Sequence, residues 1–272
     1  MDTKRNYNFD LLRFVILFIL ITFHYIVDLQ GLELLKASLN YALPGFFVLS
    51  GYLIHQQLAV IPLTRQNIVV FYLRRGIRIV PSYLLVLTIA ACFYKITYLE
   101  WSYTYLLNIR LFVSSVMGDI EAYAHRWKEN GIHYWSMGIE EQFYLLYPLI
   151  LCWVTSRNNV KPIVVLIFVC ICFRVALRAE NPSHFYGALL PVSGEYILWG
   201  ALAGELHLRG YLKRFRGDFF IYVGLLLVAI PTLGIITDHA EFTQFKPPHT
   251  MTLFAILMAL MVNALNRSVF PY

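Results

Sequence analysis

Long apolar runs, separated by short polar connections, follow one another along most of the chain. Several of these runs approach 20 residues, the length that an α-helix needs to cross a hydrocarbon core about 30 Å thick. They cover residues 9–29, 39–60, 79–97, 134–154, 162–178, 186–206, 218–236 and 249–265. The pattern predicts an all-α protein, a polytopic transmembrane helical bundle of about eight spans.

The amino-acid composition agrees with this fold class. Of 272 residues, 59% are hydrophobic and 14% are charged, whereas about 25% of residues are charged in a typical soluble domain. The chain therefore lacks the polar side chains that would cover a soluble globule. No internal repeat, low-complexity tract or linker rich in Pro, Gly or Ser divides the sequence, so residues 1–272 are predicted to form a single transmembrane domain.

The net charge of +6 raises the question of an anionic partner, either nucleic acid or a lipid surface. If the N-terminus lies inside, the connections on the inner side carry 13 basic residues and those on the outer side carry seven. Basic residues concentrate in the cytoplasmic loops of membrane proteins. The distribution predicts an N-in orientation, with membrane lipid and not nucleic acid as the partner.

The cysteines give no sign of a metal centre. All four lie in apolar runs without the spacing of metal ligands, and we expect them to be free thiols buried in packing: Cys92, Cys152, Cys170 and Cys172. No metal site is predicted.

The ionisable side chains of the first apolar run include Asp10, Arg13 and His24. Charged and titratable groups at membrane depth are costly and need either a partner or a function. At about 100° per residue, Arg13 and His24 project from one helix face about 16 Å apart along the axis, so both could line one interior channel. The alternative is that Arg13 reaches the headgroups or pairs with Asp10, while His24 is an ordinary hydrogen-bonded residue.

Ser50 and Gly51 interrupt the aromatic-rich run PGFFVLSGYLI. Small residues allow helices to approach closely. A nucleophilic serine needs an adjacent base, and none stands at a useful spacing. We therefore favour a packing role over a nucleophile for Ser50.

Three arginines, Arg74, Arg75 and Arg78, stand in the segment RRGIRIVPSY at the inner mouth of the expected third span. Pro81 follows them and is expected to end or kink the preceding turn. Arg75 and Arg78 are neighbours on one helix face, and guanidinium groups bind phosphate through rigid paired donors. The alternative is ordinary anchoring to anionic lipid.

Adjacent carboxylates, Glu140 and Glu141, occur near the start of the fourth span, in HYWSMGIEEQFYLLYPLI. Neighbouring helix positions diverge by about 100°, so one of the two is expected to point inward, where it could orient a histidine or bind an acceptor hydroxyl. The alternative is a favourable interaction with the helix dipole.

The long outer connection, 98–133, is either an acceptor-binding or lid element or an interfacial segment.

Taken in order, these clusters resemble the acyltransferase 3 family of bacterial membrane enzymes. The resemblance rests on Arg13 with ten residues before His24, and on the segments FFVLSGYLI (46–54), RRGIRIVPSY (74–83) and YWSMGIEEQFYLLYPL (134–149). A weaker similarity covers GEYILWGALAGEL (194–206). Any single cluster would be weak evidence, but four in the family's order are specific.

The resemblance implies a multi-pass protein of the bacterial cytoplasmic (inner) membrane that acylates a hydroxyl group, usually by O-acetylation. The donor would be cytoplasmic acetyl-CoA, bound as a substrate and not as a permanent cofactor. The acceptor would be a cell-envelope polysaccharide, another carbohydrate or a similar hydroxyl-bearing molecule. A partner protein stays an open question.

The resemblance also implies roles for single residues. His24 would be the general base or acyl-handling residue, and Arg13 would align it or bind the donor. The phosphates of CoA would bind to Arg75 and Arg78, with Arg74 beside them. One of Glu140 and Glu141 would support the acceptor.

Two features leave other functions open. The family bundle has more spans than this chain supplies, so the usual closing helices are expected to be missing and an inactive, truncated member is one alternative. Intramembrane Arg, His and Glu residues also line translocation paths. The second alternative is therefore a transporter or flippase of a glycan or lipid-linked substrate. Against a transporter, no pair of interrupted helices marks an inverted repeat.

Overall fold

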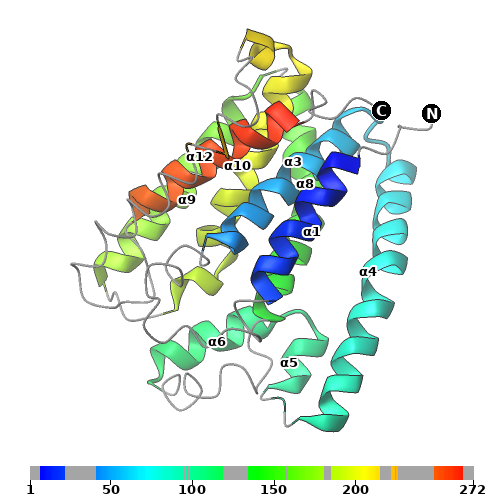
Figure 1. Ribbon diagram of the computed structural model, residues 1–272, viewed down its shortest axis with the longest axis vertical. Coiled ribbons are helices and arrows are strands. Elements are labelled where there is room, and N and C mark those ends of the chain that lie inside the picture. The colour runs from blue at the N-terminus through cyan, green and yellow to red at the C-terminus, as the bar shows by residue number, and fades with distance from the viewer. Residues whose placement is uncertain are drawn as a thin grey trace. The chain divides into compact units, whose positions relative to one another are not determined.

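The computed structural model describes residues 7–21, 41–94, 96, 98–118, 134–156, 159–180, 185–214, 222–223, 225 and 248–265 (Figure 1). All regular structure in these residues is helical, which confirms the predicted all-α class. The chain divides into two compact units, Met1–Gln56 with Glu195–Tyr272, and Gln57–Gly194.

The first unit contains four helices in its described part. They are α1 (Tyr7–Ile21), α3 (Ala42–Ala59) up to Gln56, α10 (Leu190–Leu208) from Glu195 on, and α12 (Pro248–Leu265). Three of the expected spans, 39–60, 186–206 and 249–265, match α3, α10 and α12 to within a few residues. The expected span 218–236 lies almost wholly outside the described residues.

Two glycines set the distance between α3 and α10. A Cβ atom on Gly51 would lie 1.9 Å from the carbonyl oxygen of Ile197, and one on Gly200 would lie 1.9 Å from that of Val48. Because both obstacles are backbone atoms, neither helix can carry a side chain at these positions without moving away. The packing role expected for the small residues at 50 and 51 is confirmed for Gly51, and Ser50 is buried beside it.

A buried polar chain links the same two helices one turn further on. The Nε2 atom of His55, a fully buried side chain, lies 2.8 Å from Oε2 of Glu205. Arg209 donates from Nε to the other carboxylate oxygen. A buried carboxylate is tolerated when it is paired and hydrogen-bonded, and both of these oxygens are engaged.

Substitution of the contact glycines should separate α3 from α10. We expect Gly51→Ala or Gly200→Ala to lower the free energy of unfolding by about 1–3 kcal/mol or more, the usual cost of overpacking a tight contact. Gly76→Ala is the matched control, because no atom lies within 4 Å of its Cβ position. Alanine also favours a helix interior over glycine by about 0.5–1 kcal/mol. Thermal unfolding in detergent measures all three variants, and equal melting temperatures for Gly51→Ala and Gly76→Ala would contradict the prediction.

The second unit is built around two long helices, α4 (Arg65–Phe93) and α8 (Trp135–Ser156). The short helices α5 (Leu99–Tyr103) and α6 (Leu107–Val116) follow α4, and Figure 1 shows them near its C-terminal end. Helix α9 (Lys161–Glu180) packs on α8, and so does α6. The 3-10 turn η3 (Tyr186–Ala188) contacts α6, α8 and α9.

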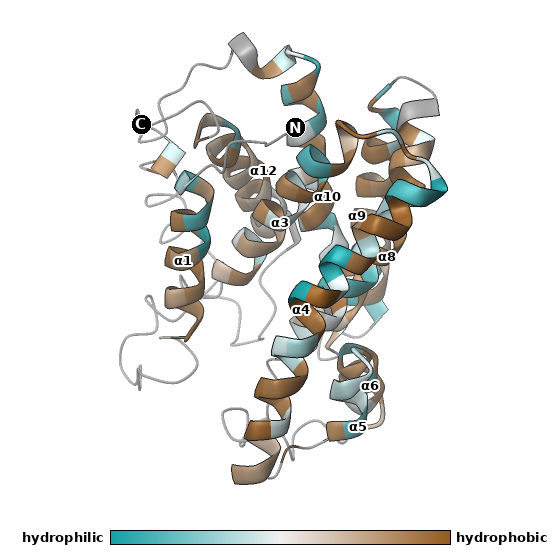
Figure 2. Ribbon diagram, turned by 90° about the vertical axis from the view of Figure 1, so that its right-hand side faces the viewer, coloured by the Kyte–Doolittle hydropathy of each residue, from teal (hydrophilic) through white to brown (hydrophobic). Residues whose placement is uncertain are grey.

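Helix α4 differs from the expected third span, 79–97. It begins at Arg65, where Thr64 caps it by accepting a hydrogen bond from the backbone N–H of Asn67 at 3.2 Å. The polar positions before residue 79 therefore continue the helix and do not form a loop, and Figure 2 shows them as a hydrophilic band among apolar turns. The side-chain cap at Thr64 stabilises the helix start ahead of the apolar run.

Pro81 lies inside α4 and does not end it, contrary to one of the two outcomes expected from the sequence. A proline within a helix leaves a carbonyl without its usual N–H donor. The hydroxyl of Ser82 donates to the carbonyl oxygens of Ile79 at 2.9 Å and of Arg78 at 3.4 Å. The carbonyl that Pro81 leaves without a donor is that of Ile77, four residues earlier, so these two bonds are separate from it and are the bonds that a serine hydroxyl commonly makes to the preceding turn of a helix.

Among the described helices, α4 and α9 are long and apolar enough to cross a membrane, as judged by length and composition. Both expose large apolar side chains over much of their surface, including Leu85 and Val86 on α4 and Phe168 on α9. Water disfavours such a surface and lipid accepts it. The expectation that all four cysteines are buried is wrong: Cys92 and Cys172 are exposed, and Cys152 and Cys170 are partly exposed. A thiol behaves as a small apolar group, so it is tolerated on the same apolar surface.

Candidate active site

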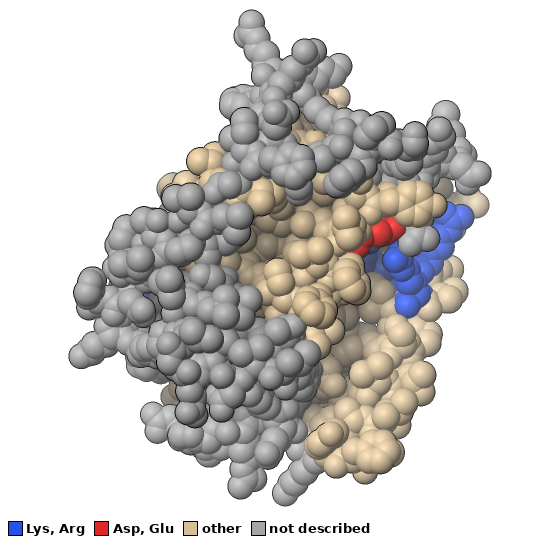
Figure 3. Space-filling model, in the orientation of Figure 1, with Lys and Arg blue, Asp and Glu red and all other residues tan. Residues whose placement is uncertain are grey.

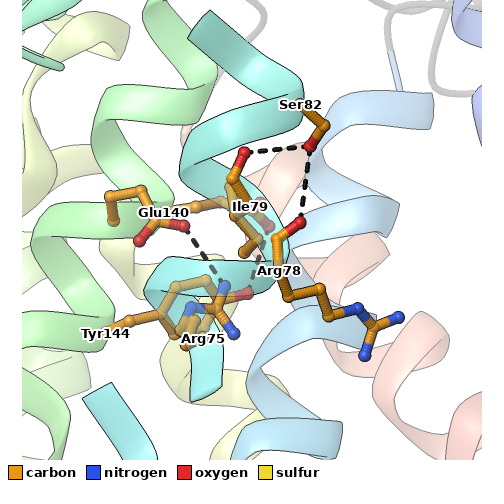
Figure 4. Close-up of polar contacts among 7 residues, drawn as sticks. Arg75, Arg78, Ile79, Ser82, Glu140 and Tyr144 are labelled. Carbon is orange, nitrogen blue, oxygen red and sulfur yellow. Dashed lines mark hydrogen bonds and ion pairs between the residues drawn. The ribbon is translucent and has the colours of Figure 1, made fainter. Parts of the chain in front are cut away.

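A charged cluster joins α4 to α8 inside the second unit. The guanidinium of Arg75 lies with one terminal nitrogen 3.4 Å from Oε1 of Glu141. Its central carbon stands 3.1 Å from the ring centroid of Tyr144, one turn further along α8. Figure 4 shows Arg75 reaching from α4 toward Tyr144 of α8. The arginine is held by a carboxylate and by an aromatic face at once.

Glu140 is almost fully buried, and it accepts a 3.4 Å hydrogen bond from the hydroxyl of Tyr144. Glu141 is about one quarter exposed and pairs with Arg75. The two carboxylates point in different directions, as expected. Neither is fully exposed, as a carboxylate that interacted only with the helix dipole would be. Glu141 takes part in the contact between α4 and α8, whereas the hydrogen bond of Glu140 lies within α8.

The ion pair between Arg75 and Glu141 corrects one expectation about where the charged residues lie along their helices. The arginines were expected at the inner mouth of one span and the glutamates near the outer end of another. Because α4 begins at Arg65, Arg75 lies well inside a helix of 29 residues, level with Glu141. The hydroxyl of Tyr72 fixes the same register by donating to the carbonyl of Leu145 at 2.7 Å.

Arg74 and Arg78 lie apart from this cluster. Both are exposed, and their spacing of four residues makes them neighbours on one face of α4. Figure 4 shows Arg78 extending away from Arg75 and Tyr144. Basic side chains gather over α4 in Figure 3, with acidic atoms directly beside them, and most other described surface in this view is uncharged. The three arginines therefore have two different environments.

The turn between α5 and α6 places Tyr105 against the start of α8. Its carbonyl accepts a 3.1 Å hydrogen bond from Nε2 of Gln142, and its ring stacks on that of Tyr83 with centroids 4.5 Å apart. A Cβ atom on Gly138 would lie 2.5 Å from the same carbonyl, so only glycine allows this approach. The outer connection 98–133 is thus, in its described part, a packed element of the unit.

Asn108 completes the attachment of α6 to α8. It donates through Nδ2 to the carbonyl of Ala188 at 3.0 Å. The side-chain amides of Asn108 and Gln142 also bond to each other in both directions, at 2.9 and 3.2 Å. Paired amides satisfy one another without solvent, which suits a buried contact.

Two buried donors near Glu141 make no hydrogen bond within the part of the chain that the structure describes. They are Nε of Arg75 and the hydroxyl of Tyr105. Burial raises the pKa of the Tyr105 hydroxyl to about 12, and the negative charge of Glu141 adds to the rise. The phenol therefore keeps its proton at neutral pH and is available as a donor.

The other predicted site residues belong to the first unit. Arg13 is partly buried on α1, three residues after Asp10. His24 lies outside the residues that the structure describes. The proposed pairing of Arg13 with His24 therefore stays a prediction.

Sequence reasoning missed Tyr105 and the pair of His55 and Glu205. His55 and Glu205 are 150 residues apart and Tyr105 lies in a connection, so no periodic pattern or motif joins any of them to its partners. One available signal was the polar end of the run SGYLIHQQ, which places a histidine in an otherwise apolar helix.

A described structure that is entirely helical, with exposed apolar helices and a buried charged contact, is typical of a membrane protein with a polar intramembrane site. The acyltransferase 3 family, described as an acyltransferase domain, matches residues 6–270. The chain belongs to this family, whose members are membrane proteins.

A curated protein of Haemophilus influenzae (strain ATCC 51907 / DSM 11121 / KW20 / Rd), described as an uncharacterized protein, is also similar. The two sequences are 26% identical over 247 residues, which cover 82% of this chain and 98% of that protein. No solved structure matches the chain.

Removal of the Arg75 side chain should destabilise the second unit. Arg75→Ala leaves the half-buried carboxylate of Glu141 without its cation and uncovers the Tyr144 ring, so we expect a loss of about 1–3 kcal/mol in unfolding free energy. Arg74→Ala, the matched control on the same helix, should stay within about 0.5 kcal/mol because that side chain is exposed. Denaturation of the purified protein in detergent provides the comparison. Equal losses for the two variants would show that the contact with α8 contributes nothing.

Proposed function

We propose that this acyltransferase transfers an acyl group, most simply acetyl, from cytoplasmic acyl-CoA to a hydroxyl group of a cell-envelope carbohydrate or similar acceptor. In this proposal the chain is a multi-pass protein of the bacterial inner membrane with its N-terminus inside. The observation that carries the proposal is the buried contact of Arg75 with Glu141 and Tyr144 in a chain of the acyltransferase 3 family. Charged groups are retained among apolar helices when they serve a function.

The reaction requires a base, a donor site and an acceptor site. A new bond forms between the acceptor oxygen and the acyl carbon, the carbon–sulfur bond of the thioester breaks, and the hydroxyl proton ends on the thiol of CoA. We assign His24 as the base that carries this proton, with Arg13 on the same helix face to align it or to bind the donor. Positive charge beside the reacting carbonyl stabilises its developing oxyanion.

We assign the phosphates of CoA to Arg74 and Arg78. Both guanidinium groups are exposed and neighbouring on α4, as binding of a soluble, anionic donor requires. Arg75 was expected to share this role. Its contacts with Glu141 and Tyr144 favour the acceptor side instead, together with Glu141.

The first test compares wild type with His24→Ala in lipid nanodiscs, using labelled acetyl-CoA and a crude cell-envelope glycan fraction. We expect label to move onto the glycan with wild type and to fall by at least about a hundredfold with the variant, because a general base contributes about 10²–10⁴ in rate. Equal transfer by a correctly inserted His24→Ala protein would exclude the assigned role. Absence of CoA binding by wild type would favour a transporter or an inactive member.

The donor assignment is tested by the double variant Arg74→Ala, Arg78→Ala. Loss of two charge-assisted contacts should raise KM for acetyl-CoA by roughly ten- to a hundredfold and leave KM for the glycan unchanged. The matched control is Arg65→Ala, an exposed arginine at the start of the same helix. An unchanged KM for acetyl-CoA would contradict the assignment and leave lipid anchoring as the role of Arg74 and Arg78.

A further inference from the structure

Tyr105 adopts a backbone conformation that is unfavourable for its residue type. Its φ of 58° lies in the left-handed region, which bulky side chains rarely enter. Such a conformation costs about 1–3 kcal/mol and persists where the surroundings hold it in place. Here the surroundings are the hydrogen bond from Gln142, the glycine at 138 and the stacked ring of Tyr83.

The constrained backbone fixes where the Tyr105 side chain can lie. The ring packs against Tyr83, which in turn contacts the ring of Tyr134 edge-on with centroids 6.0 Å apart. The hydroxyl of Tyr83 is already bound, because it donates to the carbonyl of Ser102 at 2.9 Å. The hydroxyl of Tyr105 is not used in this way and makes no bond within the described residues.

A buried donor that is left unbonded costs about 1–3 kcal/mol, so a pair of them in one cluster calls for an explanation. Nε of Arg75 and the hydroxyl of Tyr105 belong to residues that both interact with Glu141, the first through its ion pair and the second through its charge. A ligand that satisfies them must accept hydrogen bonds. Close to a carboxylate it must also donate one, which disfavours an anion.

An alcohol has the required chemistry, because one hydroxyl oxygen accepts up to two hydrogen bonds and donates one. We propose that Tyr105, together with Nε of Arg75, binds a hydroxyl group of the acceptor other than the one that is acylated, and that this hydroxyl donates a hydrogen bond to Glu141. This assignment rests on the proposed function and adds Tyr105 to it as a residue that positions the acceptor.

The test uses Tyr105→Phe, which removes one oxygen atom and keeps the ring that stacks on Tyr83. Tyr103→Phe is the matched control, since its hydroxyl lies outside the cluster and bonds to Thr88 at 2.9 Å. The probe is the cell-envelope glycan fraction after removal of its O-acetyl groups with mild base. The same fraction with its hydroxyls methylated is the control ligand.

We expect Tyr105→Phe to weaken equilibrium binding of the glycan and to raise its KM by about tenfold, the effect of one hydrogen bond. KM for acetyl-CoA should not change, and the methylated glycan should bind neither protein. The melting temperature of the variant should not fall, because the substitution removes a buried hydroxyl that has no partner in the described residues. A purely structural role would lower the melting temperature and affect both substrates alike.

The remaining outcomes separate this proposal from the function on which it rests. Glycan affinity unchanged by Tyr105→Phe, or no glycan binding by wild type, overturns the role of Tyr105. If wild type transfers label and Tyr105→Phe binds the glycan as tightly as wild type does, the proposed function is supported but Tyr105 has no part in it. Binding that depends on Tyr105, without any transfer, supports the acceptor site and contradicts the reaction.

Discussion

The need to satisfy polar groups among apolar helices governs both units of this protein. Lipid offers no hydrogen bonds, so each buried charge or amide has to find its partner within the chain. His55 with Glu205, Asn108 with Gln142 and Arg75 with Glu141 are three such solutions. Each joins two elements distant in sequence, so each also specifies which helices pack together.

Close backbone approach is the second condition, and glycine provides it at two of these three contacts, those of His55 with Glu205 and of Asn108 with Gln142. Gly51 and Gly200 bring α3 and α10 together. A Cβ atom on Gly204 would lie 3.0 Å from a ring carbon of His55, so Gly204 also allows a close contact. Gly138 plays the same part for α8 and the turn at Tyr105. Because the hydrophobic effect gives little driving force between helices in lipid, packing at small residues and interhelical hydrogen bonds have to hold the fold.

The contacts in the second unit divide the arginines of α4 by environment. Arg75 is drawn to α8 by a carboxylate and an aromatic ring, while Arg74 and Arg78 present their charges at the surface. In the proposed reaction, one face of this helix would bind the anionic donor and another the neutral acceptor. The turn at Tyr105, with its unfavourable backbone conformation, belongs to the acceptor site that we propose at Glu141.

The sequence by itself determined the helical class, the approximate bounds of α3, α8, α9, α10 and α12, and the family, because apolar periodicity and local motifs record these features directly. Tertiary structure decided that α4 starts at Arg65, that Arg75 meets Glu141, and that Tyr105 and His55 have buried roles. These depend on contacts between residues tens of positions apart, and hydropathy along a single chain carries no information about which distant side chains meet.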